Sequence, residues 1–185
     1  LADIRAQVSE AVAKHSGNYP VFYYSADENS LGWHDTPHDY CRSPHCLQAF
    51  RTWLQKKYPS LERLNALWKT SFSRWEEVVP PRLDEAKKQE NFAPWLEHRR
   101  FMLGALDAGV ETVLQTVRDL DPQGKLAHSG QGLTRVNDCW DWRVMLRHYS
   151  LSGLYGRNSG LPDLVRTLQP GYPAGLWNGY GMPLE

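Results

Sequence analysis

The segment Val21-Phe22-Tyr23-Tyr24-Ser25-Ala26-Asp27-Glu28 joins a short apolar run to two carboxylates. Its first four residues favour β-structure and do not alternate with polar residues. Such a run is typical of a strand that is buried on both faces, as strands in a parallel sheet are. Polar residues follow from Ser25 onward, so the segment predicts a buried strand with Asp27 and Glu28 near its carboxyl end.

Helix and strand patterns alternate on both sides of this segment. Apolar residues recur every three or four positions in the predicted helices, and Gly, Pro or Ser marks several of their ends. The predicted helices cover residues 1–16, 44–58, 61–68, 93–120, 139–147 and 162–168, and the further strands cover residues 125–129, 151–155 and 172–180. Strands that alternate with helices are the signature of βαβ units, so we predict an α/β fold with a parallel sheet.

Residues 30–91 interrupt this alternation. They contain a loop rich in Gly, His, Asp and Pro, the two helices at 44–58 and 61–68, and a stretch at 70–91 that is typical of a surface excursion. The charged run from Asp84 to Glu90 is best interpreted as a solvated face. We therefore expect a loop and helical excursion after the first strand.

The overall charge excludes two classes of partner. Lys and Arg number 21, Asp and Glu number 21, and the formal net charge is zero. Nucleic acids and anionic membranes both need an excess of positive charge, so we expect neither as a partner. The sequence also contains no apolar run long enough to span a bilayer and no signal-peptide pattern. Aromatic residues make up 12% of the chain, and flat rings with polar handles suit sugar faces as well as cores.

Four motifs carry a resemblance to a known family. They are Tyr23-Tyr24-Ser25-Ala26-Asp27-Glu28, a Cys-containing loop at Cys41 followed by Phe50-Arg51-Thr52-Trp53-Leu54-Gln55-Lys56-Lys57-Tyr58, Leu64-Asn65-Ala66-Leu67-Trp68 with Trp75-Glu76-Glu77, and Arg100-Phe101. In this order and spacing the chain resembles glycoside hydrolase family 42, the β-galactosidase family built on a (β/α)8 barrel. The resemblance covers most of residues 20–120 and is thin beyond residue 130.

The resemblance implies a single partial TIM-type barrel domain over residues 1–185. The four strands would correspond to the fourth to seventh strands of the barrel. Because a complete barrel needs about 250 residues, and because Leu1 already lies within a helical pattern, we expect a fragment of a larger glycoside hydrolase. Its uncovered sheet edges would lead to self-association or to contact with the rest of the parent chain. As an isolated chain it is expected to be inactive.

The resemblance also implies roles for the residues at strand ends. Glu28 matches the family's general acid/base, although by itself it could be an ordinary loop carboxylate. Asp27 stands where the family has an Asn whose amide contacts the sugar 2-hydroxyl. The family's nucleophile lies near the end of the seventh strand, where the best alignment places Asn178. An amide cannot form the glycosyl-enzyme ester, so the identity of the nucleophile stays open.

Two other functions stay open on these residues. The adjacent Asp27-Glu28 is similar to the pair of substrate-assisted N-acetylhexosaminidases, which need no protein nucleophile. The chain could instead be a non-catalytic carbohydrate-binding remnant. Residues that could contact a sugar, or alternatively pack in the core, are Trp33, His128, Tyr155, Trp177 and Tyr180.

The loop that contains Cys41 and Cys46 also holds three histidines, namely His34, His38 and His45. The spacing of the two cysteines is allowed for zinc, and some members of the family carry zinc on a Cys cluster in this loop. No cofactor is required for the predicted reaction. A structural zinc ion therefore stands as one interpretation, against free thiols and surface histidines.

Overall fold

A computed structural model describes residues 1–18, 22–32, 39–131, 139–154 and 160–176. The chain divides into two compact units. The first is formed by Leu1–Ser30, Leu106–Val136 and Trp140–Glu185, and the second by Leu31–Ala105 and Asn137–Cys139. The predicted excursion at residues 30–91 thus falls almost entirely within the second unit. That all of residues 1–185 make up one barrel domain stays a prediction.

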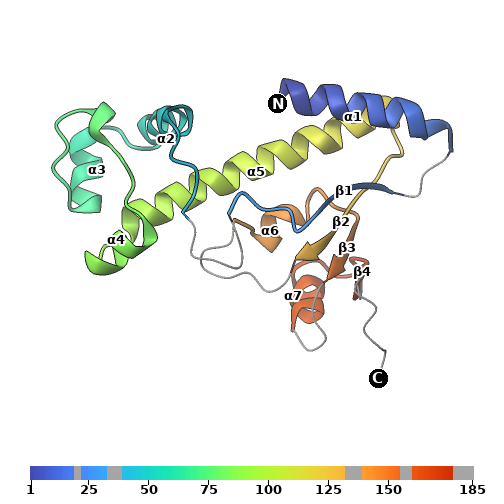
Figure 1. Ribbon diagram of the computed structural model, residues 1–185. Coiled ribbons are helices and arrows are strands. Elements are labelled where there is room, and N and C mark those ends of the chain that lie inside the picture. Colours follow the sequence, from blue (N-terminus) through green and yellow to red (C-terminus); the bar gives the residue numbers. More distant parts are fainter. Residues whose placement is uncertain (19–21, 33–38, 132–138, 155–159, 177–185) are drawn as a thin grey trace. The chain divides into compact units, whose positions relative to one another are not determined.

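The first unit is built on a four-stranded parallel sheet (Figure 1). Its strands follow chain order: β1 (Tyr23–Asp27), β2 (Leu126–Gln131), β3 (Leu151–Leu154) and β4 (Ala174–Leu176). Each adjacent pair runs in the same direction. Parallel neighbours need a crossover connection, and helices lie between successive strands in the sequence. The predicted parallel α/β sheet is therefore confirmed.

The helices of the first unit bury one face each in a shared core. They are α1 (Ala2–His15), the carboxyl half of α5 (Ala93–Leu120), α6 (Trp142–Met145) and α7 (Leu161–Leu168), with the short 3-10 helix η1 (Ser16–Asn18) after α1. The core joins Val12 of α1, Val110 and Val117 of α5, and Leu126 and Leu154 of the sheet. The helix predicted at residues 93–120 is confirmed as α5. The helix predicted at residues 139–147 is shorter, because α6 covers only four residues.

The second unit contains α2 (Pro44–Lys57), α3 (Leu61–Trp68), the 3-10 helix η2 (Trp75–Glu77), α4 (Leu83–Lys88) and the first turns of α5. Helix α2 begins where predicted: Pro44 is its first residue, and the Ser43 hydroxyl accepts a hydrogen bond from the Cys46 amide at 3.3 Å. In one core cluster of the second unit, Phe50 and Leu54 of α2 pack against α3 and Val78.

The charged run at residues 84–90 forms helix α4 and the turn after it, which the apolar pattern did not indicate. Leu83 and Ala86 are buried, whereas the charged side chains of the run are exposed, as expected for a solvated face. The Glu85 carboxylate accepts a hydrogen bond from the Arg82 amide at 2.6 Å, which satisfies a donor at the start of the helix. Among the described residues, no helix combines the length and apolar character that crossing a membrane would require.

Each unit encloses a buried histidine that packs against aromatic rings. In the first unit His128 of β2 is 1% exposed and packs against the rings of Trp140, Trp142 and Tyr149. In the second unit His98 is 2% exposed and lies against Phe50. Burial lowers the pKa of each imidazole to about 4, because a charged ring loses its hydration there.

These two histidines predict a loss of stability in acid. The unfolded chain takes up protons near pH 6.5, whereas the folded chain resists them until about pH 4. The stabilisation is therefore complete above pH 6.5 and is lost as the pH falls from 6.5 to 4, by on the order of 3 kcal/mol for each site. Urea unfolding between pH 7 and pH 4 would measure it. His128→Gln, which cannot be protonated, should flatten part of the slope, and an unchanged slope would contradict the assignment.

Candidate active site

Asp27 and Glu28 lie at the carboxyl end of β1, and both side chains are exposed. In parallel α/β barrels this end of the strands is where catalytic groups are placed. The backbone of Glu28 has φ of +49°, in the left-handed region that residues with a Cβ rarely adopt. Such a conformation costs about 1–2 kcal/mol and persists only where surrounding contacts impose it.

The neighbouring strand β2 supplies those contacts. The Glu28 amide donates a hydrogen bond to the Ser129 carbonyl oxygen at 2.9 Å. The Ser129 hydroxyl donates to Asp27 Oδ1 at 2.8 Å and also contacts the Tyr24 hydroxyl. Both members of the carboxylate pair are thus held by one residue, which the sequence pattern did not single out.

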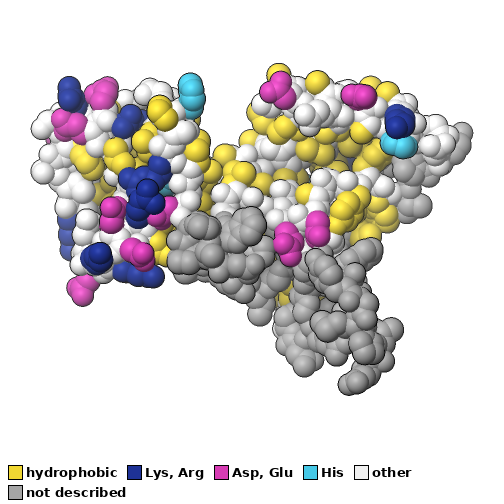
Figure 2. Space-filling model, viewed as in Figure 1, with side chains coloured by type: hydrophobic (Ala, Val, Ile, Leu, Met, Phe, Trp, Pro, Cys, Tyr) yellow, Lys and Arg dark blue, Asp and Glu magenta, His cyan; other side chains and the backbone are white. Residues whose placement is uncertain are grey.

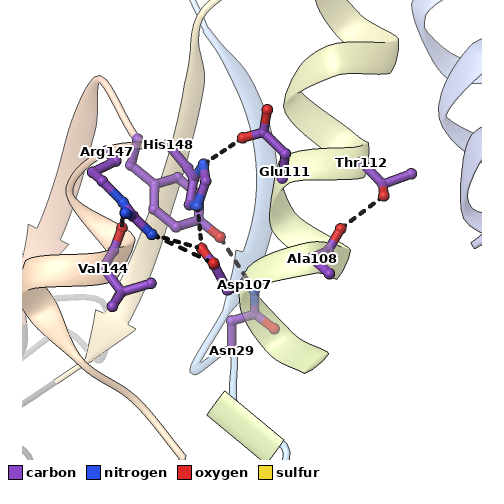
Figure 3. Close-up of polar contacts among 9 residues, drawn as sticks. Asn29, Asp107, Ala108, Glu111, Thr112, Val144, Arg147 and His148 are labelled. Atoms are coloured by element: carbon purple, nitrogen blue, oxygen red, sulfur yellow. Dashed lines mark hydrogen bonds and ion pairs between the residues drawn. The ribbon is translucent and has the colours of Figure 1, made fainter. Parts of the chain in front are cut away.

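Asn29, the next residue, is tied to another part of the first unit (Figure 3). Its amide donates to the Tyr149 hydroxyl at 3.2 Å, and Ser25 of β1 reaches the same hydroxyl at 3.4 Å. Burial raises the pKa of Tyr149, so this hydroxyl stays protonated at neutral pH. The turn after Glu28 is therefore anchored to the segment that leads into β3.

A charged cluster fixes that segment to α5. The Asp107 carboxylate lies 2.6 Å from His148 Nε2 and 3.3 Å from an Arg147 nitrogen, and Glu111 lies 2.9 Å from His148 Nδ1 (Figure 3). Each ring nitrogen of His148 therefore faces a carboxylate oxygen. The cluster is a structural anchor between α5 and the segment that leads into β3.

Of the other predicted sugar contacts, the structure describes only His128. His128 is buried on the helix side of the sheet, where its Nε2 lies 2.7 Å from the Ser152 hydroxyl and that hydroxyl lies 2.6 Å from Tyr172. Its neighbours are those of a packed, hydrogen-bonded histidine. The other predicted contacts lie outside the described residues: Trp33, Tyr155, Trp177, Asn178 and Tyr180.

Cys41 and Cys46 lie together at the start of α2. The Cys41 thiol is 3.4 Å from the Ser43 hydroxyl. A hydrogen bond with the Cys46 thiol lowers the pKa of Cys41, and the same contact raises the pKa of Cys46. Cys41 is therefore the thiol that ionises first, and thiolate is the form that binds metals. Within the described ranges, which leave out His34 and His38, no group of three metal-ligating side chains is present.

An apolar pocket of about 500 Å³ opens beside β1, between α1, α5 and the start of β2. Hydrophobic side chains are visible on this surface below α1 (Figure 2). The residues that line the pocket include Val8, Phe22, Tyr23, Val113 and Val117. Strand β1 is at one edge of the four-stranded sheet and pairs only with β2 among the described strands. The apolar surface thus continues to an open sheet edge.

The left-handed conformation of Glu28 yields a stability prediction. Glu28→Ala removes the side chain but keeps a Cβ, whereas Glu28→Gly removes both, so the difference between the two variants isolates the backbone strain. We expect Glu28→Gly to be more stable than Glu28→Ala by about 1 kcal/mol in urea unfolding. The pair Lys69→Ala and Lys69→Gly is a matched control, since Lys69 has φ of +54°. Equal stabilities for the Glu28 pair would contradict the strained backbone.

Comparison with known sequences places the chain in a family. A family model described as β-galactosidase, glycoside hydrolase family 42, matches residues 3–158. β-Galactosidase BgaP of Planococcus sp. strain L4 is 25% identical over 182 residues, which cover 90% of this chain and 26% of that protein. β-Galactosidase BgaA of Planococcus sp. strain 'SOS Orange' is 31% identical over 104 residues, which cover 51% of this chain and 14% of that protein.

Solved structures agree on the fold. The β-galactosidase of Bacillus circulans sp. alkalophilus aligns with a TM-score of 0.68 at 18% identity, over 89% of this chain and 26% of that one. A catalytic mutant of Gan42B, a family 42 β-galactosidase from G. stearothermophilus, aligns with a TM-score of 0.66 at 19% identity, over 88% of this chain and 26% of that one. The chain therefore spans about a quarter of the length of these relatives. With its parallel sheet and these matches, the chain belongs to the β-galactosidase family 42 of glycoside hydrolases and folds as a partial α/β barrel.

Proposed function

We propose that this chain is the part of a β-galactosidase barrel that carries the general acid/base, Glu28. In this proposal β1 to β4 are the fourth to seventh strands of the barrel. The observation that carries it is the carboxylate pair at the carboxyl end of β1, in a chain of this family. The left-handed backbone of Glu28 adds support, because strained conformations of residues with a Cβ cluster at functional sites.

The chemistry requires a proton donor beside the glycosidic oxygen. In a retaining glycosidase one carboxyl group protonates the leaving oxygen and later removes a proton from water, while a second carboxylate about 5–5.5 Å away attacks the sugar. Glu28 takes the first role. The second carboxylate is not assigned in this chain, since Asn178 occupies the aligned position. We therefore propose that the isolated chain is inactive and that the complete polypeptide supplies the nucleophile.

The family match supports galactosides as the substrates. It gives no support to the substrate-assisted N-acetylhexosaminidase that the Asp27-Glu28 pair alone would allow. Asp27 still differs from the family's Asn in accepting hydrogen bonds only. A hydrogen-bond donor on the sugar, such as a hydroxyl group, would suit a carboxylate at this position.

Leaving-group dependence tests the role of Glu28. In the complete polypeptide that contains this chain, Glu28→Gln should lower kcat on lactose by about 100- to 10,000-fold, because the leaving alcohol needs a proton. Hydrolysis of dinitrophenyl β-galactoside should fall much less in its first step, since that leaving group departs as a stable anion. Glu90→Gln is the matched control, an exposed glutamate that also has a positive φ. Equal losses on both substrates would contradict the assignment.

We also propose that the chain self-associates when it is expressed alone. Strand β1 pairs only with β2 among the described strands, so its other edge and the apolar pocket beside it offer a strand edge and apolar surface to a second copy. Light scattering after size-exclusion chromatography should give a mass above 21.3 kDa that rises with concentration. Phe22→Lys, which places a charge beside this edge, should shift the distribution towards monomer. A monodisperse monomer at every concentration would contradict the proposal.

A structural zinc ion held by Cys41 and Cys46 remains a proposal. Its support is that the two thiols lie together and that Cys41 ionises more readily than a free thiol. Zinc analysis by mass spectrometry on protein purified without chelators should find close to one ion per chain, lost in the Cys41→Ser, Cys46→Ser double variant. Cys139→Ala is the control, since Cys139 is buried. A metal-free wild-type protein would remove the proposal.

A further inference from the structure

The end of β2 fits around the carboxylate pair in a way that the proposed acid/base role does not explain. The Ser129 hydroxyl lies between two partners, Asp27 and Tyr24. An ionised carboxylate can only accept hydrogen bonds, so the Ser129 hydroxyl must donate to Asp27. Its oxygen is then left to accept the proton of the Tyr24 hydroxyl. This chain of donors fixes the direction of Asp27 Oδ1 towards β2.

The backbone of Ser129 holds the second member of the pair. Its carbonyl oxygen accepts a hydrogen bond from the Glu28 amide at 2.9 Å, at the residue whose backbone adopts the left-handed conformation. Ser129 is 2% exposed, whereas Asp27 and Glu28 are exposed, so the hydrogen bonds that join them are part-buried. Hydrogen bonds to a buried residue of a strand keep the neighbouring turn in one geometry.

Because Gly130 has no side chain, Asp27 and Glu28 can occupy the space beside it. Its φ is +94°, and a Cβ built on it would meet Asp27 Oδ1 and would lie 2.6 Å from Glu28 Cγ and 2.7 Å from the Glu28 amide nitrogen. The amide nitrogen cannot retreat easily, because it is bonded to Ser129. Both the conformation and the contact therefore require glycine at this position.

The register of the sheet marks the same place. The pairing of β2 with β3 shifts between Ser129 and Gln131, which leaves Gly130 as the extra residue of a bulge. The pairing of β1 with β2 shifts between Tyr24 and Ala26. Bulges in strands re-aim side chains and are common next to active sites.

We propose that Ser129 and Gly130 are the positioning residues of the Asp27–Glu28 pair. This inference rests on the proposed function for its catalytic consequence. The Ser129 hydroxyl orients the Asp27 carboxylate, and the Ser129 carbonyl oxygen fixes the position of the Glu28 amide. Gly130, which has no Cβ, lets both residues lie against β2. Neither residue touches substrate; they act through the pair.

Amide hydrogen exchange of the 185-residue chain tests the geometry without any assay of activity. In Gly130→Ala the Glu28 amide should exchange at least tenfold faster, because the added methyl group breaks its bond to Ser129, while the Ser152 amide, bonded to Pro173 at 3.2 Å, keeps its protection. Gly171→Ala is the matched control: its φ is +80°, yet an added Cβ meets no atom within 4 Å. Unchanged Glu28 exchange in a folded Gly130→Ala variant would overturn the proposal.

Kinetics of the complete polypeptide supply the second measurement, which does not depend on Gly130→Ala folding. Ser129→Ala should lower kcat at least tenfold with KM changed less than threefold, because the pair is displaced while the sugar contacts remain. Ser129→Thr, which keeps the hydroxyl, should restore most of kcat. Thr116→Val removes another buried hydroxyl from the same unit, on α5, and should leave kcat unchanged.

The outcomes separate the two proposals. A wild-type polypeptide without galactosidase activity would remove the proposed function, yet the exchange data would still decide whether β2 holds the pair. An active enzyme in which Ser129→Ala keeps the wild-type kcat would overturn the positioning role and leave the acid/base role of Glu28 in place. A loss of kcat in Ser129→Ala that Ser129→Thr does not reverse would also count against it.

Discussion

The hydrogen bonds between the end of β1 and Ser129 of β2 are the constraint on which the candidate site depends. They join residues about one hundred positions apart, 102 for the Asp27 contact, and they close only if the two strands lie parallel and in register. Helix α5 makes this possible, because a parallel pair needs a long crossover and the apolar face of this helix packs on the sheet. The carboxylate pair is thus positioned by the fold of the whole first unit.

Glu28 is one of three described residues that carry a Cβ at a positive φ, the others being Lys69 and Glu90. Glu28 and Gly130 face each other with positive φ values of +49° and +94°, and the register slips on both sides of β2 nearby. A sequence selected for stability alone would place glycine or asparagine at residue 28. The glutamate at residue 28 therefore lowers the stability of the fold relative to glycine.

Each of the two units has its own hydrophobic core, with one cluster in the first unit and two in the second among the described residues. Each unit buries its own aromatic cluster and its own histidine with a lowered pKa, so each has an independent reason to lose stability in acid. The relatives are about four times longer than the matched region. In the proposed function Glu28 is one of two carboxylates, which a barrel glycosidase takes from different strands, and the second is not assigned to a described residue.

The sequence by itself determined the order of the elements and the place of Glu28. Apolar runs gave the strands, three- and four-residue spacing gave the helices, and Ser43-Pro44 marked the start of α2, because these signals are local. It could not indicate helix α4, the burial of His128 on the helix side, or the roles of Ser129 and Gly130. A serine and a glycine in a strand carry no special pattern. Their importance arises only when folding brings β2 against the end of β1, since steric fit and hydrogen bonding between distant segments are properties of the tertiary structure.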